Sequence, residues 1–495
     1  MIFQHRAVDT QATAIVAQGR QYAYGDLDRQ SAQMAAMLLL QARENTAGQI
    51  AFMVDPGFDY VAVLWGIWKA GGMAVPLCLS YPLPSLQYVL EDAAVSQVVV
   101  SPIYAKLLED HCVQEGITMH VLGQSLDPSP LELPELSEDS PALMLYTSGT
   151  TNLPKGVVLT HANLKAQVEI LVGAWQWTSE DHILCVLPLH HVHGVVNVVG
   201  CALYVGAKLT FLPQFSPEAV FRIFREDGLS LFMAVPTIYY KLIAYWESLP
   251  ESGRSALTAA MKNFRLMVCG SAALPVTTME KWKTISGHTL LERYGMTEIG
   301  MAISNPYTGE RRAGYIGQPL PGVEVRLVDE AFQSVVAGEM GEIHVRGRNV
   351  FSRYWRRPDQ TKDAFTPDGW FKTGDMAVVE EGYYRISGRN SVDIIKSGGY
   401  KLSALEIEEV LRTYPGIADV AVVGIPDEEW GEKVVAALTI TQTIDLEQLN
   451  AWIRGQMAAY KTPKKYLIVD ELPRNTMGKV VKNEVKQFFK PNQVL

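Results

Sequence analysis

The chain has 495 residues, of which 48% are hydrophobic and 19% are charged, and its formal net charge is −10. This length suggests two to four domains, and the composition excludes global disorder. An acidic chain lacks the positive field on which non-specific nucleic-acid binding depends, so no nucleic-acid partner is expected.

Membrane and secreted classes are also disfavoured. The most apolar stretch, residues 195–207, is too short to cross a bilayer and predicts a buried strand or helix pair. The first residues carry no signal-peptide apolar region. Five cysteines without a CxxC pair are typical of reduced core residues rather than disulfides or zinc ligands: Cys78, Cys112, Cys185, Cys201 and Cys269. We therefore expect a cytoplasmic enzyme.

Short apolar runs alternate with stretches of helical spacing in the first part of the chain. Residues 50–54, 98–100 and 142–146 predict buried strands, whereas 27–40 and 60–69 predict helices. Such alternation implies parallel sheets joined by crossover helices. The expected fold class is α/β, with a large N-terminal domain over residues 1–388 that contains two packed α/β subdomains and a β-rich part.

The pattern changes after about Thr373, where glycines and short β-type segments indicate hairpins with tight turns. Residues 402–412 then predict an amphipathic helix, with Ser403 as its cap and Glu406 three residues on. Residues 420–423 and 436–440 return to strand character. These segments predict a small α+β domain over residues 389–495, with the boundary at Gly388 and Arg389.

The strongest local motif is the loop YTSGTTNLPKG at 146–156, which lies between two predicted strands. Backbone N–H groups, hydroxyls and the ammonium of Lys155 are the donors that a polyphosphate needs. The spacing is not that of a P-loop, and the chain has no GxGxxG fingerprint. Taken alone, the loop is equally compatible with a Ser/Thr-rich surface turn.

Further motifs follow in a fixed order: GSAALP (270–275), ERYGMTE (292–298), GWFKTGD (369–375), SGR (387–389), IKSGGYK (395–401) and PRNTMGK (473–479). Together with the 146–156 loop they resemble the adenylate-forming superfamily of acyl-CoA synthetases, adenylation domains and luciferases. The resemblance extends from about residue 10 to about residue 490. The stretches 187–197, 235–242, 287–306 and 316–328 are similar, within that superfamily, to malonyl-CoA synthetases.

The resemblance implies an ATP site. Phosphates would be held by Thr147, Ser148, Gly149, Thr150, Thr151 and Lys155, and the adenine wall would consist of Ser271, Ala272, Glu292, Tyr294 and Gly295. Asp375 would accept the ribose hydroxyls, and Arg389 would contact the ribose or α-phosphate. Without the motif context, Asp375 would be a turn residue and Arg389 a surface residue.

The resemblance also implies three catalytic residues and a CoA segment. Lys479 would reach the α-phosphate and the acyl carboxylate, since attack of one anion on another needs charge neutralisation. Glu298 would bind Mg²⁺, with the Thr297 hydroxyl on the phosphate side. Pantetheine would pass Lys396, Ser397, Gly398 and Gly399 after the small mobile domain rotates at a hinge beyond Arg389. Many relatives carry an acidic residue or lysine at the hinge, whereas this chain has Asn390-Ser391-Val392 before Asp393, so the motif does not identify the pivot residue.

Four residues are candidates for the acyl pocket: Arg293, His191, His193 and Lys241. A buried guanidinium is costly unless it is paired, and a second carboxylate on the substrate supplies that pair. Two alternatives stay open: Arg293 forms an ion pair with Glu292, or the histidines hold a metal.

We therefore expect an ATP-dependent ligase that activates malonate or methylmalonate as an acyl-adenylate and releases pyrophosphate. It would then form the CoA thioester and AMP. The alternatives are a short- or medium-chain monocarboxylate–CoA ligase, an adenylating module that uses no CoA, and a luciferase-like oxygenase.

Overall fold

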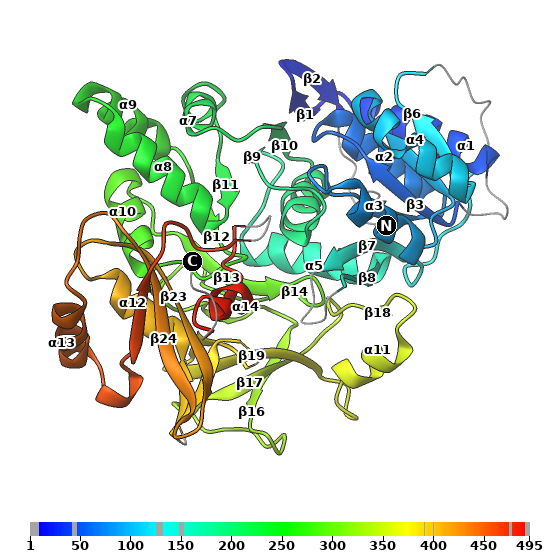
Figure 1. The fold of residues 1–495 in the computed structure, drawn as a ribbon. Helices are drawn as coiled ribbons and strands as arrows, with labels where there is room; N and C mark the ends of the chain where they lie inside the picture. Colours follow the sequence, from blue (N-terminus) through cyan, green and yellow to red (C-terminus); the bar gives the residue numbers. More distant parts are fainter. Residues whose placement is uncertain are drawn as a thin grey trace.

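The structure is a computed structural model that describes residues 9–41, 47–124, 132–147, 153–390, 392–398, 400–474 and 478–490. It contains two large sheets, a smaller antiparallel sheet and a separate C-terminal sheet (Figure 1). The predicted mixed α/β class is confirmed. Within the described residues, no helix combines the length and apolarity that a membrane crossing needs.

The first large sheet has seven strands, and its central strands run parallel. Its order is β18 (Arg353–Tyr354), β8 (Lys155–Thr160), β7 (Pro141–Thr147), β4 (Met73–Pro76), β3 (Gln49–Met53), β5 (Gln97–Val100) and β6 (Thr118–Val121). Nearly continuous burial of β3, β4 and β5 explains their unbroken apolar sequences, because strands covered on both faces expose neither side. The strands predicted at 50–54, 98–100 and 142–146 are confirmed.

The second large sheet has nine strands. Its order is β15 (Gln318–Pro319), β14 (Gly300–Ser304), β13 (Leu291–Met296), β12 (Leu266–Cys269), β11 (Leu231–Ala234), β9 (His182–Cys185), β10 (Lys208–Phe211), β1 (Thr13–Ala17) and β2 (Arg20–Ala23). One apolar core contains Ile50 of the first sheet and Ile183 of the second. The two α/β parts are therefore packed together, as the sequence predicted.

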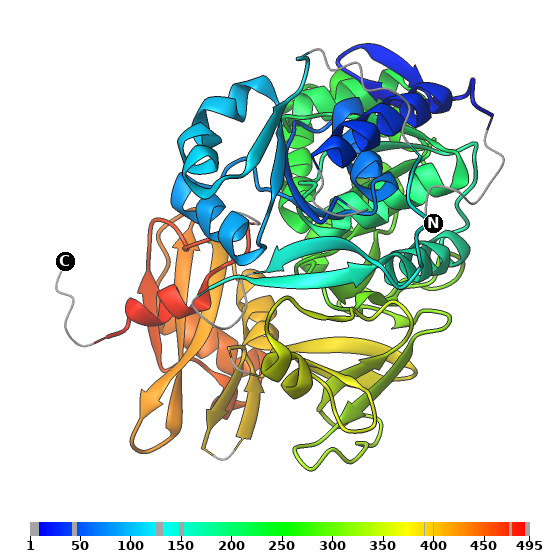
Figure 2. The ribbon, with the colours of Figure 1, turned by 90° about the vertical axis from the view of Figure 1, so that its right-hand side faces the viewer.

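Helices cover these sheets (Figures 1 and 2). They are α1 (Tyr24–Leu40), α2 (Phe58–Lys69), α3 (Leu83–Asp92), α4 (Pro102–Glu115), α5 (His161–Ala174), α6 (Cys201–Val205), α7 (Pro217–Glu226), α8 (Pro236–Ser248), α9 (Glu251–Met261) and α10 (Val276–Ser286). The helices predicted at 27–40 and 60–69 correspond to α1 and α2. All five cysteines are buried and free, so their predicted place in the core is confirmed.

The apolar run at 195–207 is helical and not a strand. It forms most of a π-helix, His193–Gly200, followed directly by α6, which ends at Val205 and is capped by Gly206 with φ +81°. Of the two predicted conformations, the helix pair is therefore correct and the strand is wrong. π-helical turns are uncommon and occur preferentially at functional sites.

A four-stranded antiparallel sheet follows, with the order β16 (Glu324–Val328), β17 (Gly341–Arg346), β19 (Phe371–Glu380) and β20 (Tyr383–Arg389). The short helix α11 (Pro358–Ala364) precedes β19. Figure 1 shows these strands below the α/β parts. The hairpins expected after Thr373 are present, because β19 and β20 pair directly.

The remaining residues form a small α+β unit with its own sheet and cores. It contains β21 (Ile394–Ser397), β22 (Tyr400–Ser403), α12 (Ala404–Arg412), β23 (Ile417–Asp427), β24 (Gly431–Ile440), α13 (Leu446–Gln456), a 3₁₀ turn (Ala459–Lys461), β25 (Lys465–Ile468) and α14 (Lys482–Gln487). The Ser403 hydroxyl accepts the Glu406 N–H at 3.1 Å and caps α12, as predicted. The chain leaves β20 at Arg389 and enters β21 at Ile394. The domain boundary at residue 388 stays a prediction.

Candidate active site

The phosphate-loop motif joins two paired strands. Thr147 ends β7, Lys155 begins β8, and the two residues are partners in the antiparallel ladder. Ser148, Gly149, Thr150 and Thr151 lie outside the described residues. The Lys155 ammonium is 5.2 Å from the centre of the Tyr354 ring, so this cation lies beside β18 at the edge of the first sheet.

Glu298 lies in the turn between β13 and β14, and only 6% of it is exposed. Its Oε1 accepts the Tyr354 hydroxyl at 3.0 Å, and burial raises the pKa of its carboxyl. Thr297 lines a cavity of about 10 Å³ next to it. A buried carboxylate with one side-chain partner among the described residues suits one Mg²⁺ ligand position, because Mg²⁺ in nucleotide sites uses one or two carboxylates plus phosphate oxygens.

One hydrogen-bonded network joins Tyr294, Asp375 and Arg389. The Tyr294 hydroxyl donates to Asp375 Oδ2 at 2.6 Å, and Arg389 Nε donates to Asp375 Oδ1 at 3.1 Å. Asp375 and Arg389 are direct partners in the β19–β20 ladder, which fixes their separation. Because Tyr294 belongs to β13, these hydrogen bonds connect the second large sheet to the antiparallel sheet.

The GSAALP segment follows β12 and lies against Arg293. A Cβ atom at Gly270 would come 2.5 Å from Arg293 Nη1, so only glycine leaves room for the guanidinium. Ser271 has φ +70°, a conformation rare for a residue with a side chain. Its hydroxyl lies between Arg293 Nη2, at 3.3 Å, and His193 Nδ1, at 3.2 Å. Ala272 lies next to Ser271, so the predicted adenine wall and acyl pocket adjoin here.

Arg293 is 3% exposed, and its Nε and Nη1 have no hydrogen-bond partner among the described residues. Burial lowers its pKa to about 10, so the guanidinium is still charged at neutral pH. The alternative ion pair with Glu292 is not formed in the described structure: Glu292 Oε1 accepts the Leu274 N–H at 3.2 Å instead. Neighbouring residues of a strand point to opposite faces, which separates the two side chains.

Three histidines lie at the start of the π-helix and just before it, and His193 shares the Ser271 hydroxyl with Arg293. Nε2 of His190, His191 and His193 is buried without a hydrogen-bond partner in the described part of the chain. Burial lowers the pKa of His190 to about 3 and that of His191 to about 4, so both are neutral at pH 7. Burial, followed by the Arg293 charge, also lowers the pKa of His193. Within the described ranges, no group of three or more His, Cys, Asp or Glu side chains is placed to hold a metal ion.

Lys479 belongs to the small unit but lies at this site. The surrounding protein, and then the Arg389 charge, lower its pKa, while Asp375 acts in the opposite direction. The residue is nevertheless exposed to solvent over a large part of its surface. The preceding Gly478 packs on Thr237 of α8. The structure thus brings Lys479 close enough to Asp375 and Arg293 for both charges to affect its pKa.

The predicted CoA segment lies elsewhere on the small unit. Lys396 and Ser397 end β21, and the Gly398 N–H donates to the Trp430 carbonyl at 2.8 Å. Gly399 lies outside the described residues. The paired strand β22 contacts the large unit through an ion pair of 2.8 Å between Lys401 and Glu330. This orientation therefore presents Lys479, and not the glycine segment, to the site.

The sequence predicted one residue of the acyl pocket, Lys241, that the structure does not bring to the site. It also missed two residues that the structure does bring there, Tyr354 and His190. Lys241 is exposed on α8, with its ammonium 5.9 Å from the centre of the Phe215 ring. Tyr354, the partner of Glu298, was missed because it lies 56 residues further along the chain. His190 was also missed, although its position beside His191 was a usable signal.

The fold and these motifs define the class of protein. The sequence pattern of the AMP-binding enzyme family matches residues 3–355, and that of the AMP-binding enzyme C-terminal domain matches residues 406–479. The chain belongs to this family of AMP-forming CoA ligases.

Individual members of this family can be compared with the chain over nearly its full length. The chain is 44% identical to "Malonate--CoA ligase ACSF3, mitochondrial" of Xenopus laevis, covering 99% of this chain and 92% of that protein. It is 39% identical to "Malonate--CoA ligase" of Arabidopsis thaliana, covering 96% and 86%. The crystal structure of ATP-bound MatB from Rhodopseudomonas palustris superposes with a TM-score of 0.91 at 33% identity, covering 99% and 98%.

Proposed function

We propose that this chain is a malonate–CoA ligase that uses ATP to form malonyl-adenylate and pyrophosphate, and then forms malonyl-CoA and AMP. Methylmalonate is a second candidate substrate, because it carries the same two carboxylates. The observation that carries the proposal is Arg293, a buried cation whose Nε and Nη1 have no partner in the described structure. The names of the relatives support the same substrate.

In the first step, the Asp375 carboxylate accepts the ribose hydroxyls and Arg389 contacts the ribose or α-phosphate. Lys479 neutralises the α-phosphate and the attacking malonate carboxylate, which would otherwise repel each other. This role needs a cation within reach of both groups, and Lys479 lies close enough to Asp375 and Arg293 for their charges to affect its pKa. A charged ammonium at this place needs no separate base, since malonate attacks as its carboxylate.

The phosphate side fits a magnesium ion. Glu298 offers one anionic oxygen, Thr297 precedes it in the chain, and Lys155 lies near Tyr354 at the end of the loop. Mg²⁺ bound there would neutralise the charge that develops on pyrophosphate as it leaves. Tyr354 orients the Glu298 carboxylate, because its hydroxyl donates to Oε1.

In the second step, the small unit rotates beyond Arg389 and presents the segment Lys396–Gly398 to the adenylate. Asp393 is suited to support such a hinge, because its Oδ2 accepts the Arg389 N–H at 3.0 Å. Gly398, with φ +57°, has no side chain to block a thin pantetheine arm, and the Trp430 ring packs against it in the present orientation.

The acyl end selects the substrate by charge. The distal carboxylate of malonate would pair with Arg293 and accept hydrogen bonds from the neutral imidazoles of His191 and His193. A monocarboxylate leaves the guanidinium buried and unpaired, which is costly. The alternative, a short- or medium-chain monocarboxylate–CoA ligase, is therefore disfavoured by the same observation.

Pyrophosphate release from ATP, measured with a series of monoacids and diacids, with and without CoA, tests the proposal. Malonate should support the highest kcat/KM, and thioester should form only with CoA. Equal rates with butyrate and malonate would favour the monocarboxylate alternative. The cytoplasmic location expected from the sequence stays a prediction.

A further inference from the structure

Helix α10 begins immediately after Pro275, and its first N–H group is satisfied from the other unit. A helix leaves its first four N–H groups without intrahelical acceptors, and proline has no side-chain acceptor with which to cap them. Here Oε1 of Glu409, on α12 of the small unit, accepts the Val276 N–H at 3.0 Å. The cap of a helix in the large unit is thus supplied by the small unit.

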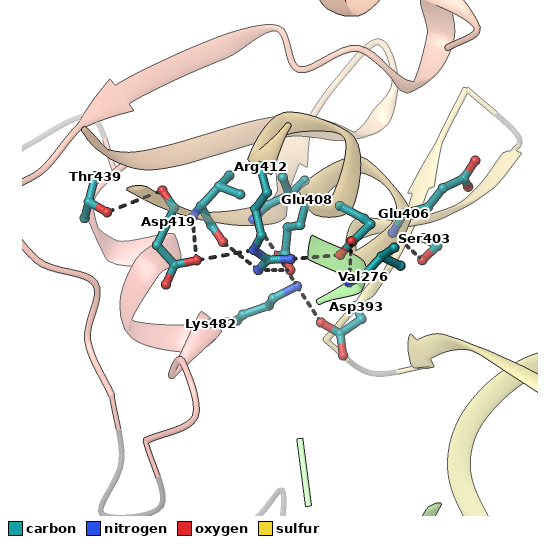
Figure 3. Close-up of polar contacts among 12 residues, drawn as sticks. Val276, Asp393, Ser403, Glu406, Glu408, Arg412, Asp419, Thr439 and Lys482 are labelled. Carbon is teal, nitrogen blue, oxygen red and sulfur yellow. Dashed lines mark hydrogen bonds and ion pairs between the residues drawn. The ribbon is translucent and has the colours of Figure 1, made fainter. Parts of the chain in front are cut away.

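Glu409 is held in place by a cluster of charges, part of which is shown in Figure 3. Arg412 lies 3.6 Å from its Oε2 and also reaches Glu408, at 3.5 Å, and Asp419, at 3.4 Å. Lys482 continues the cluster, since its ammonium is 2.6 Å from a carboxylate oxygen of Glu408.

The same ammonium is also 2.6 Å from Asp393 (Figure 3). Asp393 adjoins the predicted hinge, and Lys482 lies three residues beyond Lys479. The capping contact is therefore connected through paired charges to the hinge and to the segment that carries Lys479.

On the large unit, the capped helix continues directly from the adenine-wall segment 270–275. Glu292 binds this segment from inside through the Leu274 N–H, two residues before Val276. Glu409 binds it from the small unit. Residues 274–276 are thus held between two glutamate side chains, one from each unit.

We propose that Glu409 is a positioning residue for adenylation: it caps α10 only when the small unit presents Lys479, and so stabilises that orientation and the adenine-wall segment together. The inference rests on the proposed two-step function. An anion at a helix N-terminus is favoured by the helix dipole and by the free N–H groups. Rotation of the small unit about residues beyond Arg389 breaks this contact, so it acts in the first step alone.

A first measurement needs no substrate. Hydrogen–deuterium exchange of the full chain should show that Glu409→Ala raises exchange at the Val276 amide about 10- to 100-fold, the factor expected for one hydrogen bond to a charged group. Glu406→Ala is the matched control. Glu406 lies on the same helix with similar side-chain exposure, 38% against 35%, but it pairs with Lys461 inside the small unit at 2.6 Å. The control should leave Val276 unchanged.

A second measurement separates the half-reactions. Glu409→Ala should lower kcat/KM for pyrophosphate release about five- to thirtyfold, without slowing thioester formation from supplied malonyl-adenylate and CoA. Glu409→Gln keeps an acceptor oxygen for Val276 and should recover part of the loss.

Two results would overturn the inference: unchanged Val276 exchange in Glu409→Ala, or equal losses in both half-reactions. If the wild-type chain released no pyrophosphate with any acid, the proposed function would be wrong. The exchange measurement would still decide whether Glu409 caps α10.

Discussion

The nucleotide end and the acyl end of the site differ in how completely their polar groups are hydrogen-bonded. At the proposed nucleotide end, the side chain of Asp375 accepts hydrogen bonds from Tyr294, at 2.6 Å, and from Arg389, at 3.1 Å. At the acyl end, Arg293 keeps two nitrogens without partners within the described structure, and the neighbouring histidines each keep one.

The difference has a physical meaning. A buried polar group without a partner destabilises the protein until something pairs with it. Under the proposed function, the nucleotide end is already hydrogen-bonded for a co-substrate that does not vary, whereas the acyl end would become satisfied only with the right acid. Selectivity is therefore expected to depend on the acyl end, and the rate with any acid on the nucleotide end.

The largest effect is expected at the acyl end. Arg293→Met should lower kcat/KM for malonate by about two to four decades, because loss of one partner of a buried ion pair costs roughly 3–5 kcal/mol. The kcat/KM for butyrate should fall little or should rise, because the butyrate tail has no charge that could pair with Arg293. Steady-state kinetics with both acids measures the ratio.

The control is the next residue on the same strand. Tyr294→Phe removes the hydroxyl that donates to Asp375 and should raise the KM for ATP while leaving the malonate-to-butyrate ratio unchanged. If Arg293→Met lowered kcat/KM equally for both acids, Arg293 would be a structural residue and the dicarboxylate proposal would lose its main support.

Lys479 acts between the two ends. Lys479→Ala should slow adenylation by on the order of 10²–10³-fold, the effect of removing one preorganised electrostatic group. Thioester formation from supplied malonyl-adenylate should be nearly unchanged, because the lysine serves the first orientation only. Single-turnover assays of each half-reaction separate these effects. Equal losses in both would contradict the assignment of Lys479 to one step.

Glu298→Gln probes the phosphate side of the nucleotide end. The change is nearly isosteric and keeps an acceptor for the Tyr354 hydroxyl, but it removes the anionic charge. The Mg²⁺ concentration for half-maximal rate should rise by roughly 10- to 100-fold, with little change in thermal stability. Mg²⁺ titrations at saturating malonate test this. An unaltered Mg²⁺ dependence would exclude Glu298 from metal binding.

The smallest effect concerns stability and pH at Glu292. Burial raises the pKa of this carboxyl from 4.5 to about 8 in the folded chain. The folded state then holds a proton that the unfolded state releases, so this contribution is fully present below pH 4.5 and is lost as pH rises through 8. We therefore compare the Tm of Glu292→Gln with that of wild type at two pH values. The difference, variant minus wild type, should be a few degrees more positive at pH 8.5 than at pH 5, roughly as expected for a change of a few kcal/mol.

Scanning calorimetry at the two pH values measures this shift. Glu247→Gln is a control, because Glu247 is an exposed residue that pairs with Lys281 on the surface. A difference in Tm between Glu292→Gln and wild type that did not vary with pH would show that Glu292 is ionised in the folded protein.

Much of the fold was predictable because it depends on local pattern. The buried strands, the helices α1 and α2, and α12 with its Ser403 cap follow from hydrophobic period and capping chemistry, which act over a few residues. The 195–207 run was harder. A short apolar run is compatible with a strand or a helix, and burial alone does not distinguish them.

The site divides in the same way. The sequence by itself determined which chemical groups are present: the loop donors, Asp375, Arg389, Lys479, and an arginine beside the YGMTE motif. It also determined their order along the chain, from which the resemblance to adenylate-forming enzymes follows.

Only the tertiary structure decided which groups meet. Sheet register sets Asp375 against Arg389, and opposite strand faces separate Arg293 from Glu292. Tyr354 reaches Glu298 across 56 residues, and Glu409 reaches Val276 across 133 residues. Such contacts depend on how distant segments pack, and local pattern carries no information about partners that far apart. The tertiary structure also decides that Arg293 has no ion-pair partner. Among the described residues, no acid is packed close enough to pair with it, and nothing in its own segment predicts this.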